Sequence, residues 1–158
     1  MKATPKPRPT DAGAPPLSEF LCFAVYSANL AFSKVYRPML DALGLTYTQY
    51  VTVVALSEEG DQTVGGLGEK LFLESNTLTP ILKKLEAMGY VERARDPNNE
   101  RQVRVNLTKS GKRLREKALG FDLRGASGLS AKDFARLQKE VVTLRDSLIA
   151  FAQDEAPA

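Results

Sequence analysis

Cys22 is the side chain in this sequence that is best suited to redox chemistry. It is the only cysteine among 158 residues, and the chain has five tyrosines but no histidine and no tryptophan. Two prolines precede a helix that we expect to begin with Ser18 as its cap. A helix N-terminus favours the thiolate form of a cysteine, so the pattern indicates a reactive thiol. The competing interpretation is a small buried side chain that only packs.

The tyrosines are the second chemical feature, because a phenol can donate a hydrogen bond to a thiolate. Tyr36 and Tyr47 flank the joint between the first two predicted helices. Cys22 and Tyr36 are 14 residues apart, which is about 21 Å along a helix, so they cannot touch within one chain. They can meet if two such helices cross antiparallel in a dimer, and the pattern therefore predicts a sensor at a subunit interface.

The composition excludes several kinds of function. With one cysteine and no histidine, we expect no hydrolytic triad, no metal site and no internal disulfide framework. We also expect no cofactor and no catalytic residues. The chain has no apolar run near the roughly 18 residues of a membrane helix, and its start lacks the apolar core of a signal peptide. The sequence therefore favours a cytoplasmic protein with no membrane partner.

Residues 63–89 have the pattern of a helix-turn-helix. Val64, Leu67 and Leu71 share one face of a short helix, and a three-residue turn follows. A second helix is expected over residues 75–89, with Ser75 as its cap and Gly89 at its end. Its apolar positions recur with a helical period at Leu78, Ile81, Leu82, Leu85 and Met88.

A charged β-hairpin is expected to complete this motif as a wing. Residues 90–95 and 101–107 are predicted strands, and the second alternates polar and apolar side chains as a half-buried strand does. Between them, residues 96–99 read Asp-Pro-Asn-Asn, which is turn chemistry. The order of elements predicts a winged helix-turn-helix, a fold that reads double-stranded DNA.

The second helix and the hairpin carry side chains that suit DNA, because hydroxyl, amide and basic groups bind phosphates and base edges. Between residues 61 and 119 there are 12 Lys or Arg and 8 Asp or Glu. This excess would displace counterions from DNA, although a solvated charged face gives the same count. The predicted DNA-binding residues are Ser75, Asn76, Thr77, Thr79, Lys83, Arg93, Arg95 and Arg101.

The chain is expected to divide into three parts. Residues 1–16 hold five of the nine prolines and are expected to form a flexible arm. Residues 46–119 would form the winged helix-turn-helix domain. Residues 17–45 and 120–153 would form a helical dimerisation region, because the first helix is too apolar for a surface helix and the last has a heptad seam. The seam residues are Phe134, Leu137, Val141, Leu144, Leu148 and Phe151.

The predicted fold class is therefore mainly α with a small β-hairpin. Pro38 is expected to kink the first helix near its end. Residues 120–129 are expected to be a connecting turn, and Ser130 with Asp133 resembles a capping box at the start of the last helix.

Five segments of the sequence form a recognisable set. They are residues 21–24 (LCFA), 36–41 (YRPMLD), 44–50 (GLTYTQY), 77–86 (TLTPILKKLE) and 100–101 (ER). Together they resemble the MarR family of regulators and, within it, the OhrR group of organic-hydroperoxide sensors. The resemblance extends over about residues 18–152.

The resemblance implies a homodimeric repressor that binds double-stranded operator DNA. It implies that Cys22 is the redox-sensing thiol and that Tyr36 and Tyr47 reach it from the partner subunit to stabilise it. It also implies that the helix at residues 75–89 enters the major groove and that Arg101, in the wing, reaches the minor groove.

Two positions depart from that family. Many relatives carry an aspartate where this chain has Asn99, where it pins the hairpin by a salt bridge, so either the wing is looser here or Asp96 or Glu100 replaces that salt bridge. Some relatives carry a second, resolving cysteine near the start of the last helix, whereas residues 125–128 read Gly-Ala-Ser-Gly. Either the chain senses with one cysteine, or Ser127 stands in place of the second.

The function predicted from the sequence is redox-sensing repression. An organic hydroperoxide, as inducer, oxidises Cys22 to a sulfenic acid, and the operator is released. One alternative is a MarR-type repressor released by a small phenolic or carboxylate ligand, with Cys22 structural. A thiol peroxidase is a second alternative, disfavoured by the missing resolving cysteine, and an activator is a third.

Overall fold

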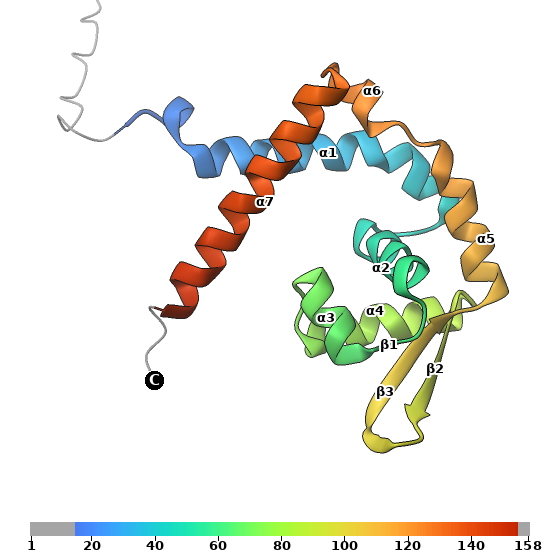
Figure 1. Cartoon of the computed structure of the whole chain (residues 1–158). Helices are drawn as coiled ribbons and strands as arrows, with labels where there is room; N and C mark the ends of the chain where they lie inside the picture. Colours follow the sequence, from blue (N-terminus) through green and yellow to red (C-terminus); the bar gives the residue numbers. More distant parts are fainter. Residues whose placement is uncertain (1–14, 155–158) are drawn as a thin grey trace, which may run out of the picture. The chain divides into compact units, whose positions relative to one another are not determined.

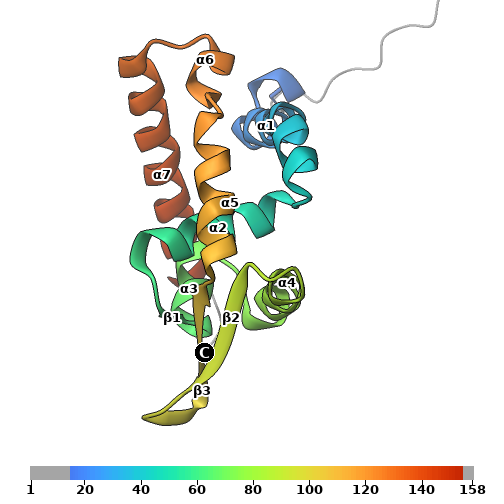
Figure 2. The same cartoon turned by 90° about the vertical axis from the view of Figure 1, so that its right-hand side faces the viewer.

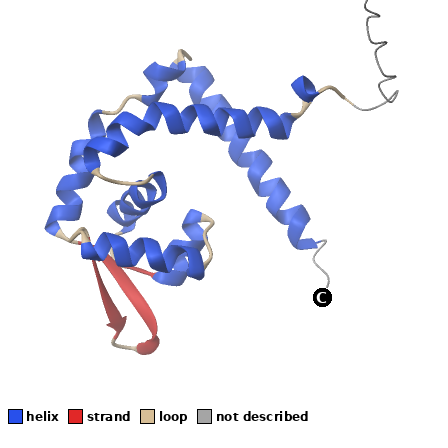
Figure 3. Cartoon of the chain, turned by 180° about the vertical axis from the view of Figure 1, so that it is seen from behind, coloured by secondary structure: helices blue, strands red, loops and turns tan. Residues whose placement is uncertain are grey.

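The computed structural model describes residues 15–154 (Figure 1). The arm predicted at residues 1–16 lies, apart from its last two residues, outside the described residues. The chain separates into two compact units, residues 1–51 and residues 52–158. Helices make up most of the structure, and its strands form one small antiparallel sheet (Figure 3). The predicted fold class is confirmed.

The first unit is dominated by one long helix, α1 (Leu21–Leu43). A short 3-10 helix, Leu17–Glu19, precedes it, so the predicted start at Ser18 is wrong and Phe20 is the residue before the helix. Ser18 fails as a cap because this 3-10 turn ends before α1 begins. Cys22 is consequently the second residue of α1. The helix continues through Pro38 without a break.

A tight corner joins α1 to α2 (Tyr47–Glu59). Gly44 adopts φ 68°, a left-handed conformation that favours glycine, and the N–H of Leu45 donates to the carbonyl of Leu40 at 3.0 Å. Thr46 and Gln49 then form a reciprocal capping box. The Gln49 N–H donates to Thr46 Oγ1 at 3.3 Å, and the Thr46 N–H donates to Gln49 Oε1 at 2.9 Å. The corner is therefore held by local backbone geometry.

The second unit contains the winged helix-turn-helix (Figure 2). After α2 come β1 (Gln62–Thr63), α3 (Val64–Leu71), α4 (Ser75–Ala87), β2 (Val91–Asp96) and β3 (Asn99–Leu107). The sheet order is β1-β3-β2, and both pairings are antiparallel. The β2–β3 hairpin is the predicted wing. Strand β1 was not predicted, because two residues are too few to show an alternating pattern.

The core of this unit is built from the positions that the helical period selects. Leu67 of α3 and Leu78, Leu82 and Leu85 of α4 are fully buried, as is Val105 of β3. Each fully buried leucine contributes roughly 1.5–3 kcal/mol from the removal of apolar surface from water. The shared core therefore orients α3, α4 and the sheet relative to one another.

Side-chain caps and glycines set where these elements end. Thr63 Oγ1 accepts from the Gly66 N–H at 3.1 Å, and Thr108 Oγ1 accepts from the Gly111 N–H at 3.1 Å. Gly89, at φ 76°, ends α4 as predicted. Ser75 does not cap α4: it is the first helical residue, and Glu74 precedes it without a side-chain hydrogen bond. Helix α4 therefore begins one residue earlier than a cap at Ser75 would allow, and Ser75 lies inside the helix.

Three further elements follow the sheet. They are α5 (Lys109–Lys117), α6 (Leu123–Ser127) and α7 (Ala131–Asp154), with a 3-10 turn at Ala118–Gly120. The predicted loop over residues 120–129 is wrong, because Asp122 accepts from the Gly125 N–H at 2.9 Å and starts a short helix there. Ser130 accepts from the Asp133 N–H at 3.1 Å, as the capping pattern predicted.

Helices α1 and α7 leave their apolar side chains in solvent. Leu40 is the only buried residue of α1, and α7 has none. Within the predicted seam of α7, Leu148 and Phe151 are 59% and 65% exposed. Such a surface is rare on a monomeric protein and marks an interaction site. None of the helices within residues 15–154 is long and apolar enough to cross a membrane.

Gly111 offers a test of how closely α5 packs on the base of the wing. A Cβ at this position would lie 2.1 Å from the Tyr90 carbonyl oxygen, which is backbone. We expect Gly111→Ala to lower the free energy of unfolding by about 2–3 kcal/mol, the cost of overpacking. Urea unfolding followed by circular dichroism measures it.

The matched control is Gly65→Ala in α3, where an added Cβ would meet nothing within 4 Å. This variant should be about as stable as the parent, or more stable by up to about 1 kcal/mol, because alanine is the better helix former. A Gly111→Ala protein as stable as Gly65→Ala would contradict the close packing.

Candidate nucleic-acid interface and redox site

A tight turn connects α3 to α4 in the helix-turn-helix. Phe72 occupies the turn at φ 56°, and the Leu73 N–H donates to the Gly68 carbonyl at 2.9 Å. A Cβ on Gly68 would lie 2.7 Å from the Leu73 carbonyl oxygen, so only glycine permits this close approach. Because the leucines of α4 face the core, its polar residues lie on the outside.

The structure leaves most of the predicted DNA-binding side chains exposed. Thr79 and Arg93 are the half-buried ones. The Thr79 hydroxyl donates to the Ser75 carbonyl at 2.6 Å, and the Thr77 hydroxyl donates to Asn76 Oδ1 at 3.3 Å. The exposed set is Ser75, Asn76, Thr77, Lys83, Arg95 and Arg101. These residues come from α4 and from the β2–β3 wing, so they belong to neighbouring elements of one unit.

Arg93 has a partner that sequence analysis missed. Its guanidinium donates to Glu86 Oε2 from Nε at 3.0 Å and from Nη2 at 2.5 Å, which links β2 to α4. The hydrogen bonds from Arg93 lower the pKa of the Glu86 carboxyl. The pair therefore sets the position of the wing relative to α4, and direct binding of DNA by Arg93 stays a prediction.

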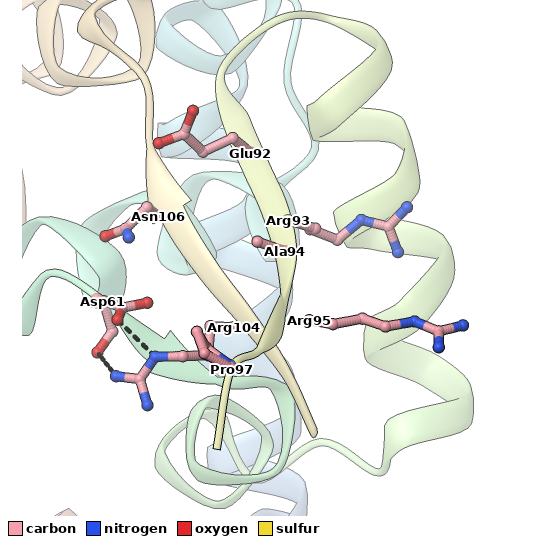
Figure 4. A pocket seen from close by; sticks show the side chains of 8 residues that line it. All are labelled: Asp61, Glu92, Arg93, Ala94, Arg95, Pro97, Arg104 and Asn106. Atoms are coloured by element: carbon pink, nitrogen blue, oxygen red, sulfur yellow. Dashed lines mark hydrogen bonds and ion pairs between the residues drawn. The ribbon is translucent and has the colours of Figure 1, made fainter. Parts of the chain in front are cut away.

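Arg104 is a functional candidate that the sequence did not single out. It bonds to Asp61, just before β1, and its Nη1 lies 3.2 Å from Asp96 Oδ2, at the end of β2. Figure 4 shows Arg104 directed toward Asp61, whereas Arg93 and Arg95 leave β2 toward α4. One guanidinium therefore ties three segments of the sheet together.

Asp96 is the acceptor at the base of the wing tip. Its Oδ1 accepts from the Asn98 N–H at 2.8 Å, and the side chain is 9% exposed. The Asn98 N–H and the Arg104 guanidinium lower the pKa of the Asp96 carboxyl. Asp96 forms a salt bridge with Arg104 and not with Arg101, so its replacement of the aspartate missing at Asn99 stays a prediction. Asn99 instead accepts from the Arg101 N–H at 3.2 Å.

Cys22 is an exposed, free thiol at the N-terminus of α1. The Ala24 N–H donates to the Phe20 carbonyl at 3.0 Å. The N–H groups that precede Ala24 lie at the positive end of the helix dipole. Phe23 and Leu21 beside it are 39% and 60% exposed. The thiol therefore combines accessibility, a favourable helix end and an apolar neighbourhood.

The structure brings Tyr36 and Tyr47 together, and it adds Tyr50. The ring centroids of Tyr36 and Tyr47 are 5.2 Å apart, with an interplanar angle of 65°, and those of Tyr36 and Tyr50 are 6.2 Å apart. Burial raises the pKa of Tyr36 and of Tyr47, and the neighbouring phenols raise it further. These phenols therefore stay protonated at neutral pH and can act as hydrogen-bond donors.

The structure does not bring Cys22 to this tyrosine cluster within one chain. Cys22 and Tyr36 lie on the single helix α1, and 14 residues correspond to about 21 Å. Among residues 15–154, no group of three or more His, Cys, Asp or Glu side chains is placed to hold a metal ion.

Comparison with known proteins identifies relatives over most of the chain. The family described as "Transcriptional regulator SarA/Rot" matches residues 34–118. The HTH-type transcriptional regulator TtmR of Methylorubrum extorquens is 43% identical over 145 residues, covering 90% of this chain and 74% of that protein. The organic hydroperoxide resistance transcriptional regulator of Bacillus subtilis is 39% identical over 134 residues, covering 84% and 91%.

A solved structure extends these matches to three dimensions. Reduced AbfR bound to DNA aligns with a TM-score of 0.68 and 34% identity, over 84% of this chain and 94% of that one. AbfR is a protein of Staphylococcus epidermidis. The same structural family therefore covers both the winged unit and the flanking helices.

Asp96→Asn tests the tie between Arg104 and the wing. Because the pKa of Asp96 is lowered in the folded protein, its contribution to stability is present above the ordinary aspartate range and is lost as the pH falls through the folded value. We expect the variant to have a lower Tm at neutral pH and a smaller further loss of Tm in acid. Thermal unfolding recorded from neutral to strongly acidic pH measures both.

Glu92→Gln is the control, since Glu92 is an exposed carboxylate on the same strand. It should leave the Tm and its pH dependence close to those of the parent. The tie to Arg104 would be refuted by an Asp96→Asn protein that follows the parent curve at every pH.

Proposed function

The chain belongs to the MarR/SarA family of transcriptional regulators, and from this membership we propose that it is a redox-sensing repressor. A homodimer binds operator DNA while Cys22 is reduced and releases it when an organic hydroperoxide oxidises Cys22. The position of Cys22 carries the proposal: an exposed thiol at the start of α1, in an apolar surface. Similarity to the Bacillus subtilis regulator supports the choice of oxidant.

A second copy of the chain is the natural partner for α1 and α7. Both helices expose apolar side chains along their length, among them Phe32 and Val35 of α1 and Leu137 and Val141 of α7. Burial of this surface is favourable at about 25 cal/mol per Å². A symmetric dimer covers the same patch on both chains at once, which supports association through these helices.

A dimer would also allow the thiol of one chain to meet the phenols of the other. One rigid helix holds Cys22 and Tyr36 about 21 Å apart within a chain. If the α1 helices of two chains cross antiparallel, the start of each helix approaches the end of the other. Tyr36 and Tyr47 of one chain then donate hydrogen bonds to the Cys22 thiolate of the other.

The oxidation step needs only the thiol and the peroxide. The Cys22 thiolate attacks the terminal oxygen of ROOH, the S–O bond forms and the O–O bond breaks. The alkoxide takes up a proton and leaves as the alcohol ROH, so sulfur is oxidised by two electrons to the sulfenic acid and the peroxide is reduced. The sulfenic acid can then condense with a small thiol to a mixed disulfide, releasing water.

Oxidation is coupled to DNA through the dimer geometry. The added oxygen, or a mixed disulfide, changes volume and hydrogen bonding where two chains pack, and packed interfaces respond by discrete shifts. Two winged units read half-sites about one helical turn apart, so a shift of a few ångströms lowers operator affinity. The alignment with reduced AbfR bound to DNA supports DNA binding by this fold, and the docking of α4 in the major groove follows the general geometry of helix-turn-helix motifs.

Cys22→Ser tests the sensor directly. The hydroxyl cannot be oxidised to a sulfenic acid, so cumene hydroperoxide should weaken operator binding of the parent by roughly tenfold or more and leave the variant unchanged. Fluorescence anisotropy with labelled operator DNA measures binding, and mass spectrometry of the peptide containing Cys22 counts the oxygen added. Peroxide-induced release by Cys22→Ser would remove the proposal.

Lys83→Ala and Arg101→Ala test the docking mode. Both side chains are exposed on the elements proposed to face DNA. If Lys83 binds a phosphate, its loss should weaken binding on all sequences and reduce the salt slope of log K by about 1. Arg101→Ala should weaken binding by roughly 1–3 kcal/mol.

Lys132→Ala, an exposed lysine at the start of α7, is the charge-matched control and should bind as the parent does. Parent-like affinity in both test variants would rule out this docking mode, whatever the behaviour of Cys22.

A further inference from the structure

The tyrosine cluster contains a member that the predicted thiol-stabilising pair does not use. Tyr36 comes from α1, and Tyr47 and Tyr50 lie three residues apart on α2, on one face of that helix. Tyr36 contacts both rings, at 5.2 Å to Tyr47 and 6.2 Å to Tyr50. Both distances and the tilted angles fall in the range of favourable aromatic pairs.

The three rings differ in how much solvent they meet. Tyr47 is 48% exposed, whereas Tyr36 and Tyr50 are half-buried. Tyr50 lies in the second turn of α2, where its N–H donates to the Thr46 carbonyl at 3.0 Å. Its backbone is therefore fixed by a hydrogen bond at the start of α2, next to the capping box of Thr46 and Gln49. Tyr47 is the outer ring of the cluster, and Tyr50 is the inner one against which Tyr36 rests.

Removal of the Tyr50 ring would take away an aromatic contact of Tyr36. A half-buried ring with space behind it can change its side-chain torsion, and an aromatic pair is worth roughly 0.5–1.5 kcal/mol. A hydrogen-bond donor must be held in one orientation to stabilise a charge effectively. The orientation of the Tyr36 phenol thus depends in part on the ring of Tyr50.

We propose that Tyr50 is a positioning residue of the sensor, whose ring holds the Tyr36 phenol in the orientation that stabilises the Cys22 thiolate of the partner chain. This inference rests on the proposed function. Tyr50 acts through Tyr36, and its contribution comes from the ring face. Removing the ring should therefore slow the reaction of Cys22 with hydroperoxide, whereas removing only the hydroxyl should not.

The test compares Tyr50→Leu with Tyr50→Phe in the full-length protein. We measure the second-order rate of Cys22 oxidation by cumene hydroperoxide, with sulfenic acid detected by mass spectrometry. Tyr50→Leu should react roughly two- to tenfold more slowly than the parent, the rate equivalent of one lost aromatic pair. Tyr50→Phe should stay within about twofold.

Titration of the phenols, followed by absorbance, separates a loss of Tyr36 positioning from a general destabilisation of the protein. Tyrosinate absorbance near neutral to alkaline pH reports the titration of the phenols. Because burial is the main cause of the raised pKa of Tyr36, Tyr50→Leu should admit water and move that pKa down toward the ordinary tyrosine value. Tyr90→Leu is the control, since it removes a half-buried tyrosine from outside residues 1–51 and should leave the oxidation rate unchanged.

The outcomes distinguish this inference from the function on which it rests. A parent thiol that does not react with hydroperoxide removes both. A reactive parent with Tyr50→Leu at the parent rate overturns the role of Tyr50 alone, and so does a Tyr50→Phe variant as slow as Tyr50→Leu, because the hydroxyl would then be the active group. If Tyr50→Leu is unfolded by circular dichroism, Tyr50→Met gives the same comparison with an unbranched apolar side chain.

Discussion

Helix α1 is the constraint on which the proposed chemistry depends. It is one rigid rod of 23 residues that carries the thiol near its start and Tyr36 near its end. A rod of this kind keeps the two groups apart in its own chain, and it exposes apolar side chains over most of its length. The exposed apolar surface and the separation between Cys22 and Tyr36 are therefore properties of the same helix, and a second chain would account for both. In the proposed function, redox sensing and association of two chains therefore depend on the same helix.

The winged unit shows a different design, in which ion pairs add to the buried core in positioning the strands of the wing. Arg93 with Glu86 links β2 to α4, and Arg104 links the start of β1 to the end of β2 through Asp61 and Asp96. Surface ion pairs contribute little to stability, about 0–1 kcal/mol each. Their value here is orientation, since a wing must keep a set angle to the helix beside it when both contact one ligand.

The corner between α1 and α2 connects these two regions of the chain. The left-handed Gly44 and the capping box of Thr46 and Gln49 determine how Tyr47 and Tyr50 meet Tyr36. Helix α2 then continues from the first unit into the second, where Val53 and Leu56 are buried. Helix α2 thus carries both the tyrosines of the cluster and residues of the buried core of the winged unit.

The sequence by itself determined the elements whose signals are local and periodic. Leu78, Leu82 and Leu85 recur with a helical period and are buried, and Gly89 and Thr108 mark a helix end and a helix start. Only the tertiary structure decided the short strand β1 and the partners of Arg93 and Arg104. These depend on register and on groups up to 43 residues apart, and sequence spacing carries no information about such distances. The Tyr36–Tyr50 contact belongs to this second kind, because the angle of the corner, and not the composition of either helix, brings the rings together.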